Sequence, residues 1–400
     1  MLIFPLRGSG SGIYVDNLTK FLIRRDHQVK ALCCEHYPPE KMYPVEAILF
    51  SNGENERFDL DFNFPAFTTH PLSRRTTFGN LTGAQKRAYL RVFREKISQE
   101  VAIFEPDVVH VHHGWVIAAV VAELSVPYII TLHGTEHLGF EKYPDYRKLA
   151  LLGMQGAYLV LAHTEDDRER AILTYNLSPQ KVVVVESGVD TDVFQPFQVD
   201  QSHKKSLLES YGIHAFDRPV VFFGGKLTPI KGVDVLLRAA HIYSQIDERP
   251  VTLVAGDGDA REDLERLAGE LKLDDVYFLG HQNHQQMVYL FNVADVVALP
   301  SSVESSPLIA MEALACGTPV VASDIGGFRQ LVNVNDNEQI GYLVKPDDPV
   351  ALAQKIIASI QDRLEQKAHC TAADHIRRNF SWEKSVSRIE SAYERCLAGI

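Results

Sequence analysis

The sequence contains little cysteine, no long apolar run and too few basic residues to balance its acids. No apolar run reaches the roughly 20 residues that cross a bilayer, and the short apolar start before Arg7 is too brief for a secretory signal. The cysteines have neither the even number of a disulfide framework nor the spacing of a metal site, which favours a reducing compartment. There are five of them: Cys33, Cys34, Cys316, Cys370 and Cys396. We therefore expect a cytoplasmic protein.

Charge and size restrict the class of protein further. A formal net charge of −12 argues against general nucleic-acid binding. With 46% hydrophobic and 23% charged residues, the chain is typical of soluble globular proteins, and its 400 residues suggest two or three domains. Short apolar runs alternate with helical stretches in both halves, which predicts an α/β fold with parallel sheets covered on both faces. The polar segment 195–206 indicates a domain boundary.

The stretch 304–322, which reads ESSPLIAMEALACGTPVVA, combines a helix start with a buried strand. A helix of this kind presents unpaired N–H groups, here those of Leu308 and Ile309, and the positive end of its dipole. This combination predicts a phosphate site. The residues that indicate the helix start are Ser305, Ser306 and Pro307.

Two carboxylates frame this helix start. Glu304 precedes the helix, and Glu312 lies within it between Met311 and Ala313, where an unpaired acid is costly. Either both have ordinary structural partners, or both accept hydrogen bonds from a polyhydroxylated ligand. They fit poorly as a hydrolytic pair, because eight helical residues span roughly 12 Å, whereas a retaining glycosidase pair needs about 5 Å.

Glycine-rich turns follow strands in both halves. After the predicted strand 1–5, the segment 7–12 reads RGSGSG, which allows close approach to a ligand but lacks the full dinucleotide motif and its acidic partner. After the predicted strand 220–223, Gly225 and Lys226 come shortly before Lys231. Two lysines around such a turn can neutralise a diphosphate.

Several histidines follow or end strands in the first half. His110 and His112 lie on the same side of the predicted strand 108–112, and His133 ends the strand 128–132. A metal site is disfavoured, because no carboxylate or cysteine accompanies them at ligand spacing.

Two other segments leave alternatives open. The aperiodic segment 54–80 is expected to be a surface excursion whose side chains either contact an acceptor or pack on their own domain; these are Phe62, Phe64, Phe67 and Arg74. The basic amphipathic helix 84–100 either lies on an anionic membrane or presents a solvated face, and the second interpretation is favoured.

Glu304, seven intervening residues, Glu312 and the run ALACGTPVVASDIGG to Gly327 resemble the signature of retaining nucleotide-sugar glycosyltransferases of family 4, which have the GT-B fold. Further motifs follow in the family's order over nearly the whole chain. The resemblance implies two Rossmann-like domains facing each other across a cleft. Residues 1–196 would bind the acceptor, 197–379 would bind the donor, and the helix 380–400 would pack back on the first domain.

The resemblance also implies roles for individual residues. His133, Glu304 and Lys231 would act in catalysis. The donor would contact Gly225, Lys226, Lys231, Gly256, His281, Gln282, Glu304, Pro307, Leu308, Ile309 and Glu312. The acceptor and its phosphate loop would involve Gly10, Gly12, His110, His112 and Glu136. No metal and no cofactor is expected beyond the UDP-sugar as co-substrate.

The sequence departs from the family pattern at three places. Glu136 stands where relatives commonly carry Asp, and Lys226 stands where they carry Arg, which loses a planar two-pronged donor. Ser305-Ser306-Pro307 replaces a run of small, aromatic and glycine residues, and proline has no N–H to offer a phosphate.

The expected function is transfer of a hexose-type sugar, by default glucose or N-acetylglucosamine, from a UDP-sugar to a hydroxyl of a small soluble acceptor. The expected partners are the nucleotide-sugar and the acceptor, without nucleic acid, in a monomer or homodimer. One alternative is a membrane-peripheral transferase that acts on a lipid-linked or polysaccharide acceptor through contact of 84–100 with the inner membrane face. Another is a non-catalytic nucleotide-sugar-binding subunit. A nicotinamide-dependent oxidoreductase is less well supported, because the acid that would bind the ribose is missing.

Overall fold

The computed structural model describes residues 1, 4–6, 9–67, 72–73, 76–304, 306–332, 340–365 and 369–399, with backbone alone at 362–365, 369 and 370. The chain divides into two compact units. The first unit consists of Met1–Ser187 together with Trp382–Ile400, and the second consists of Gly188–Ser381. Of the helices in these described ranges, none is long and apolar enough to span a bilayer.

The described strands of the first unit form two parallel sheets. The order is β1-β2 in one sheet and β3-β4-β5-β6 in the other. Ile, Leu and Val predominate in β4 and β5, whose residues are all buried, as expected for strands covered on both faces. The strands are β1 (Ala31–Glu35), β2 (Val45–Leu49), β3 (Val109–His112), β4 (Tyr128–Thr131), β5 (Leu159–Ala162) and β6 (Val182–Val184).

The predicted strand 1–5 is only partly described. Met1 donates its terminal amine to the His110 carbonyl at 2.6 Å and accepts from the His112 N–H at 2.8 Å, so it pairs with β3. Leu2 and Ile3 lie outside the described residues.

Gly10 and Gly12 lie in the first turn of helix α1 (Gly10–Arg24), and not in a loop as the sequence suggested. The side chain of Ser9 caps this helix by accepting a hydrogen bond from the Gly12 N–H at 3.1 Å. A Cβ at Gly12 would come within 2.4 Å of the Pro5 carbonyl oxygen. Glycine is therefore required for close packing of the helix on the preceding segment.

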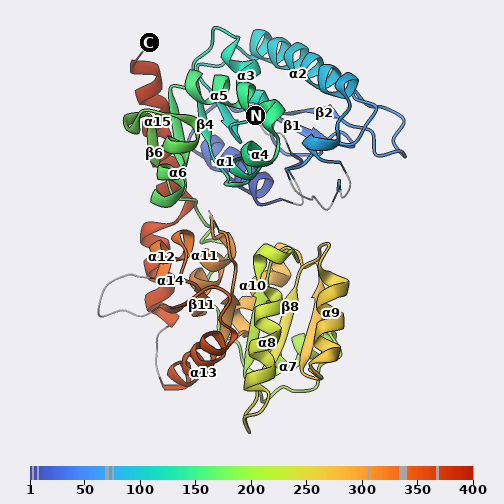
Figure 1. Cartoon of the computed structure of the whole chain (residues 1–400). Coiled ribbons are helices and arrows are strands. Elements are labelled where there is room, and N and C mark those ends of the chain that lie inside the picture. Colours follow the sequence, from blue (N-terminus) through green and yellow to red (C-terminus); the bar gives the residue numbers. More distant parts are fainter. Residues whose placement is uncertain are drawn as a thin grey trace. The chain divides into compact units, whose positions relative to one another are not determined.

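The remaining helices of the first unit cover its sheets (Figure 1). They are α2 (Gly83–Phe104), α3 (Val116–Ala122), α4 (Thr135–Lys142), α5 (Arg147–Gly156), α6 (Glu165–Tyr175) and α15 (Trp382–Ala398), with short 3-10 turns η1 (Phe78–Asn80), η2 (Pro144–Tyr146) and η3 (Pro179–Lys181). Trp382 at the start of α15 is buried against Tyr14 and Phe21 of α1, with ring centroids 5.0 and 5.9 Å away.

The aromatic residues of the segment 54–80 belong to the core. Phe62, Phe64 and Phe67 are buried in the first unit's apolar cluster, which favours packing over acceptor contact. Arg74 lies outside the described residues.

Helix α2 buries Tyr89, Phe93 and Ile97, while Val92 of the same expected apolar face is only partly buried. Most of its basic side chains are paired with acids of the same unit: Lys86 with Asp145, Arg91 with Glu95, Arg94 with Glu123, and Lys96 with Glu46 and Glu100. This internal pairing weakens the membrane interpretation of 84–100, because an anionic surface would have to compete with these carboxylates.

The second unit contains a parallel sheet with the order β12-β11-β10-β7-β8-β9 among its described strands. This is a doubly wound sheet, in which the direction of strand addition reverses between β7 and β10. Sheets of this kind bind ligands at the carboxyl ends of the strands beside the reversal point. The strands are β7 (Val220–Gly224), β8 (Val251–Ala255), β9 (Val276–Gly280), β10 (Val296–Leu299), β11 (Val320–Ser323) and β12 (Gly341–Val344).

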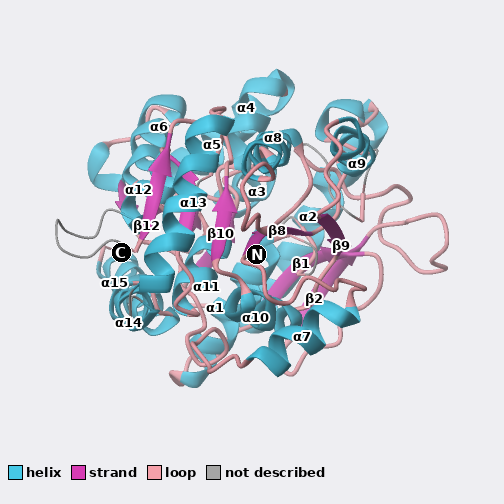
Figure 2. Cartoon of the chain, turned by 90° about the horizontal axis from the view of Figure 1, so that it is seen from below, coloured by secondary structure: helices cyan, strands magenta, loops and turns pink. Residues whose placement is uncertain are grey.

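Helices flank this sheet on both sides (Figures 1 and 2). Helix α8 packs against α9 and α13, and α11 packs against α10 and α14. The helices are α7 (Gln201–Ser210), α8 (Val233–Tyr243), α9 (Arg261–Glu270), α10 (His284–Val293), α11 (Leu308–Ala315), α12 (Gly326–Val332), α13 (Pro349–Glu365) and α14 (His369–Asn379), with the 3-10 turn η4 (Pro229–Lys231).

The boundary between the units lies at 187–188, ahead of the 196–197 boundary expected from the sequence. Val189 donates its N–H to the Phe380 carbonyl at 2.9 Å and pairs with Ser381. Val189 and Phe194 are buried in the apolar core of the second unit. These contacts place residues 188–196 in the second unit, and 380–381 with them.

Candidate active site

Glycines bring the carboxyl ends of β7, β8 and β9 into direct backbone contact. Gly225 donates to the Ala255 carbonyl at 3.0 Å, and Gly256 donates to the Gly280 carbonyl at 2.8 Å. Gly256 has a φ of +136°, and a Cβ there would lie 1.8 Å from the Gly225 carbonyl oxygen. No other residue fits without displacing the neighbouring loop. The predicted glycines therefore build a backbone platform at the ligand-binding edge of the sheet.

Lys231 and Glu304 meet at the point where the strand order reverses. The Lys231 Nζ and the Glu304 Oε2 are 2.5 Å apart, and both side chains are largely buried, with 25% and 16% exposure. Ser302 donates its N–H to the Ile230 carbonyl at 2.9 Å, which ties the loop after β10 to the loop after β7. A Cβ at Gly232 would lie 2.1 Å from the Pro300 carbonyl oxygen, so the same contact requires glycine.

The ion pair between Lys231 and Glu304 was not expected from the sequence, which assigned the two residues separate tasks. They are 73 positions apart, and only the neighbouring positions of β7 and β10 bring them together. A phosphate that approaches Lys231 must share it with this carboxylate.

Glu312 projects from α11 into an environment that disfavours its charge. Burial raises the pKa of Glu312 to about 8. Among the described residues, no hydrogen-bond or ion-pair partner of its carboxyl group is found. The side chain is only partly buried, so a ligand can reach it, and carboxyl groups with a raised pKa concentrate at functional sites.

The start of α11 differs from the prediction in its hydrogen bonding. Pro307 occupies the N-cap position, and the helix begins at Leu308. The Leu308 N–H donates to the Ser306 carbonyl at 2.9 Å, so it is already paired in this structure. A phosphate contact at Leu308 would require this bond to open. Ser305, the other predicted capping residue, lies outside the described residues.

The predicted base-binding residues follow β9. Gln282 accepts a hydrogen bond from the Tyr211 hydroxyl at 2.6 Å and donates its amide to the Leu279 carbonyl at 2.8 Å. Its side chain is therefore occupied, whereas His281 is exposed. Any recognition of a base here falls to the backbone. Near the end of β7, burial lowers the pKa of Lys226, and the charge of Asp259 opposes the shift.

His133 of the first unit lies just after β4 and is held from two sides. Its ring Nε2 is 3.2 Å from the His112 Nδ1. Its backbone N–H donates to the Glu136 Oε1 at 2.7 Å. The other oxygen of Glu136 is 3.2 Å from the His113 Nδ1. One carboxylate therefore links the backbone of His133 to a second histidine.

The electrostatics of this cluster favour neutral rings at His110, His112 and His133 and an ionised carboxylate at Glu136. Burial lowers the pKa of His110, His112 and His133 well below the usual value for histidine. Repulsion from neighbouring histidines adds to the shift in all three. Repulsion from the terminal amine also contributes at His110 and His112. Burial acts to raise the pKa of Glu136, but the hydrogen bond and charge of His113 outweigh it, so the pKa is lowered. Glu136 is therefore ionised and accepts hydrogen bonds.

The surroundings of three of the predicted acceptor contacts weigh against direct contact with an acceptor. His112 is 2% exposed and Glu136 is fully buried, so neither is placed to touch an acceptor directly. His110 bonds to the Tyr393 hydroxyl and to the Thr131 hydroxyl at 2.8 and 2.7 Å.

Sequence reasoning missed His113 and His163. His113 has a φ of +66°, a conformation rare for a residue with a side chain, which bends the chain after β3 and turns its ring toward Glu136. His163 follows β5, and its ring centroid lies 5.6 Å from that of His133. Because alternate residues of a strand face the same side, the sequence placed His110 and His112 together, but it gave no indication of the bend at His113. The position of His163 at a strand end was the available signal.

No group of three or more His, Cys, Asp and Glu side chains in the described part of the chain is arranged to hold a metal ion.

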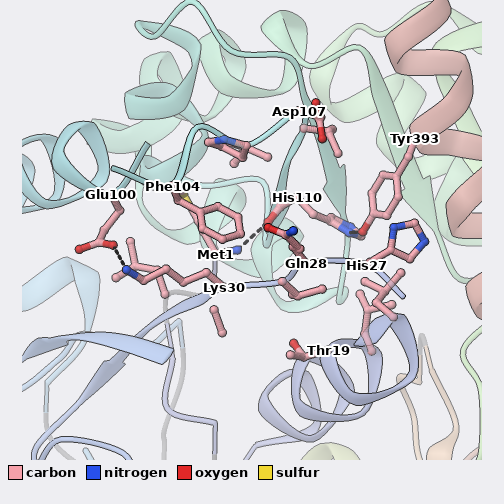
Figure 3. A pocket seen from close by; sticks show the side chains of 18 of the residues that line it. Met1, Thr19, His27, Gln28, Lys30, Glu100, Phe104, Asp107, His110 and Tyr393 are labelled. Carbon is pink, nitrogen blue, oxygen red and sulfur yellow. Dashed lines mark hydrogen bonds and ion pairs between the residues drawn. The ribbon is translucent and has the colours of Figure 1, made fainter. Parts of the chain in front are cut away.

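A cavity of about 520 Å³ in the first unit lies beside this cluster, with His110 and His112 in its wall. It is lined mainly by the segments that lead into β1 and β3, together with residues of α1 and α2, and Figure 3 shows the Lys30–Glu100 ion pair and the His110–Tyr393 hydrogen bond at its walls. Of the predicted site residues, only His110 and His112 line it. Doubly wound sheets bind ligands at the opposite, carboxyl edge, so this cavity is not the candidate active site.

Comparison with known proteins agrees with this geometry. The model of the family described as "Glycosyltransferase Family 4" matches residues 8–193, and that of "Glycosyl transferases group 1" matches residues 212–375. The D-inositol 3-phosphate glycosyltransferase of Mycolicibacterium smegmatis is 31% identical over 349 residues, which cover 82% of this chain and 77% of the relative. That of Salinispora tropica is 35% identical over 253 residues, 60% of this chain, and the match spans only 51% of the relative's length.

Two solved structures share the fold over nearly the whole chain. Sucrose-phosphate synthase from Thermosynechococcus elongatus superposes with a TM-score of 0.76 at 22% sequence identity, and the match covers 100% of this chain and 99% of the synthase chain. Anabaena HepE in complex with UDP and glucose has a TM-score of 0.74 at 21% identity and covers 98% of each chain. The fold and the loops at the carboxyl edge of the second sheet define a GT-B protein built from two Rossmann-like units. With the relatives above, the chain belongs to glycosyltransferase family 4.

Proposed function

We propose that this protein is a metal-independent, retaining glycosyltransferase that moves a hexose-type sugar from a UDP-sugar to a hydroxyl group. The observation that carries the proposal is Glu312, a partly buried carboxyl group on α11 whose surroundings disfavour its charge and which is bonded to no described side chain. A ligand with several hydroxyl groups supplies the missing donors. The ribose and sugar of a nucleotide-sugar have this chemistry, and the solved HepE structures contain UDP, or UDP with glucose.

The second unit supplies the donor site. Lys231 and Lys226 lie around the turn after β7 and offset the charge of the diphosphate as it departs, a form of electrostatic transition-state stabilisation. Glu304 orients the hydroxyls of the transferred sugar, and Glu312 holds the ribose. Backbone groups at His281 and Gln282 contact the base, and the backbone platform of Gly225 and Gly256 borders the diphosphate.

Phosphate binding also involves the start of α11. The Ile309 N–H and the positive helix end face the diphosphate, and Leu308 joins when its bond to Ser306 opens. Because Pro307 has no N–H, this chain has fewer backbone donors there than the family pattern implies.

The first unit supplies the acceptor site through His133. Its ring positions the sugar and the acceptor hydroxyl, while Glu136 holds its backbone. The new glycosidic bond forms as the bond from the anomeric carbon to the diphosphate breaks. A phosphate oxygen of the leaving group takes the acceptor proton on the same face, which retains the configuration.

A small soluble acceptor fits the relatives best. The curated proteins that resemble this chain are named D-inositol 3-phosphate glycosyltransferases, and the acceptor in that name is a small polyhydroxylated phosphate. Glucose or N-acetylglucosamine is the proposed sugar, and the cytoplasm is the proposed location. The paired basic residues of α2 weigh against the lipid-linked alternative.

The proposal is tested by donor turnover in the presence of EDTA. The purified protein is incubated with UDP-, GDP-, ADP- and dTDP-sugars, and nucleotide release is followed with and without a pool of small acceptors. We expect release from one donor, strongly reduced in Glu312→Gln and Lys231→Ala. Glu270→Gln, an exposed change on α9 in the same unit, is the matched control and keeps full activity.

Two results would overturn the proposal. Nucleotide binding without release from any donor would make the protein a non-catalytic binder. Release abolished by EDTA and restored by a divalent cation would contradict metal independence.

A further inference from the structure

We propose that His112 is a positioning residue that holds the Nε2 of His133, so that His133 meets its hydroxyl ligand through Nδ1. This inference rests on the proposed role of His133 and deepens it. It assigns a task to a histidine that is too deeply buried to contact substrate itself, at 2% exposure.

The geometry fixes one ring nitrogen of His133. The His133 Nε2 lies 3.2 Å from the His112 Nδ1, and their ring centroids are 5.4 Å apart. One of these two nitrogens donates and the other accepts, because a neutral imidazole has one of each. In either direction, the ring of His133 is left with Nδ1 for another partner.

His112 is itself held in place. Its ring stacks on that of His110, with centroids 4.4 Å apart. His110 is anchored at both nitrogens, by Tyr393 of α15 and Thr131 of β4. A chain of contacts therefore runs from α15 through β3 to His133, and it leaves the His112 ring little freedom to rotate.

The backbone and the ring of His133 are held by different residues. Glu136 accepts from the His133 N–H at 2.7 Å and sets the position of the backbone. His112 contacts only the ring. A change at His112 should therefore turn the ring of His133 without moving its backbone, which separates a positioning role from a general folding role.

Protonation of the pair would break this contact, because two imidazolium rings have no acceptor to share. The groups that face His133 are Tyr14 from α1, His112 at the end of β3, His113 just after it, Glu136 of α4 and His163 after β5. Burial lowers the pKa of both His112 and His133, so the contact persists at neutral pH.

The first test reads the contact directly. In the full chain labelled with ¹⁵N-histidine, we expect a scalar coupling through the hydrogen bond between the His112 Nδ1 and the His133 Nε2. The coupling should vanish in His112→Leu. Absence of the coupling from the unmodified protein would overturn the proposal, whatever the activity of the enzyme.

The second test uses turnover. His112→Leu should lower kcat by about 10- to 100-fold, the cost of a misplaced group, with little change in the KM for the donor. His112→Asn places an amide nitrogen near the position of Nδ1 and should recover most of the rate. The control is His36→Leu, which removes a buried histidine bonded to Asn63 elsewhere in the same unit.

The outcomes separate this inference from the proposed function. If His133→Ala leaves transfer unchanged, the proposed role of His133 is wrong. If His133→Ala abolishes transfer while folded His112→Leu remains fully active, only the positioning role of His112 is wrong. If His112→Asn is as slow as His112→Leu with its fold intact, the hydrogen bond is not what matters, and the inference also fails.

Discussion

Replacing Glu312 by glutamine should stabilise the unliganded protein while impairing its activity. The folded state holds this carboxyl without a partner, and burial raises its pKa to about 8 from an ordinary 4.5. Glutamine has nearly the same shape and carries no charge. The exchange therefore removes the penalty for burying a carboxylate, and it also removes the group proposed to hold the ribose.

The magnitude follows from the difference in pKa between the folded and unfolded states. Below pH 4.5 both states keep the proton, and the side chain has no effect on the pH dependence. Between pH 4.5 and 8 the unfolded chain loses the proton while the folded chain retains it, so stability falls as the pH rises. At about 1.4 kcal/mol per pH unit, the penalty at pH 7 is about 3 kcal/mol.

Urea unfolding followed by circular dichroism at pH 5 and pH 7 measures this penalty. The Glu312→Gln variant and the unmodified protein should differ in the free energy of unfolding by less than about 1 kcal/mol at pH 5 and by about 3 kcal/mol at pH 7, with the variant more stable. Comparing the two proteins at each pH cancels the titration of every other group. A variant less stable than the unmodified protein at pH 7, or a difference independent of pH, would refute the reasoning.

Two further predictions concern the glycine platform and the buried histidines. Gly256→Ala should lose donor binding and about 2 kcal/mol or more of stability, because its Cβ would meet the Gly225 carbonyl at a positive φ. Gly269→Ala, in a helix with open space around it, should instead be neutral or stabilising; equal effects in calorimetry would contradict the packing argument. Acidification from pH 6.5 to 5 should destabilise the first unit, since burial depresses the pKa of its clustered histidines and the unfolded chain binds more protons. Trp115 and Trp382 both belong to that unit, so their fluorescence reports the transition, and a pH-independent midpoint would argue against it.

Much of the fold was accessible from local patterns. Runs such as 220–223 and 251–255 contain enough Val and Phe to indicate buried strands, and the helices after them repeat apolar residues at helical spacing. The segment from Glu304 to Gly327 also predicted a helix start near Leu308, and the structure shows a helix at Leu308–Ala315; phosphate binding there is part of the proposed function. These features depend on residues close together in the chain, so the sequence carries them directly.

The first turn of α1 shows where local reasoning failed. The glycines between Gly8 and Gly12 suggested a loop, because glycine disfavours helices. The structure places Gly10 and Gly12 inside the helix, since Ser9 caps it and close packing against Pro5 leaves no room for a side chain. A tertiary contact therefore outweighed the intrinsic propensity.

By itself, the sequence determined the alternation of strands and helices, the glycine turns and the residue types available for a diphosphate and its sugar. Only the tertiary structure decided which polar groups meet. Lys231 pairs with Glu304, and His133 with His112, because parallel strands distant in the chain end side by side. Strand order and the bend after β3 depend on packing of the whole unit, whereas propensity and periodicity report only on near neighbours in the chain.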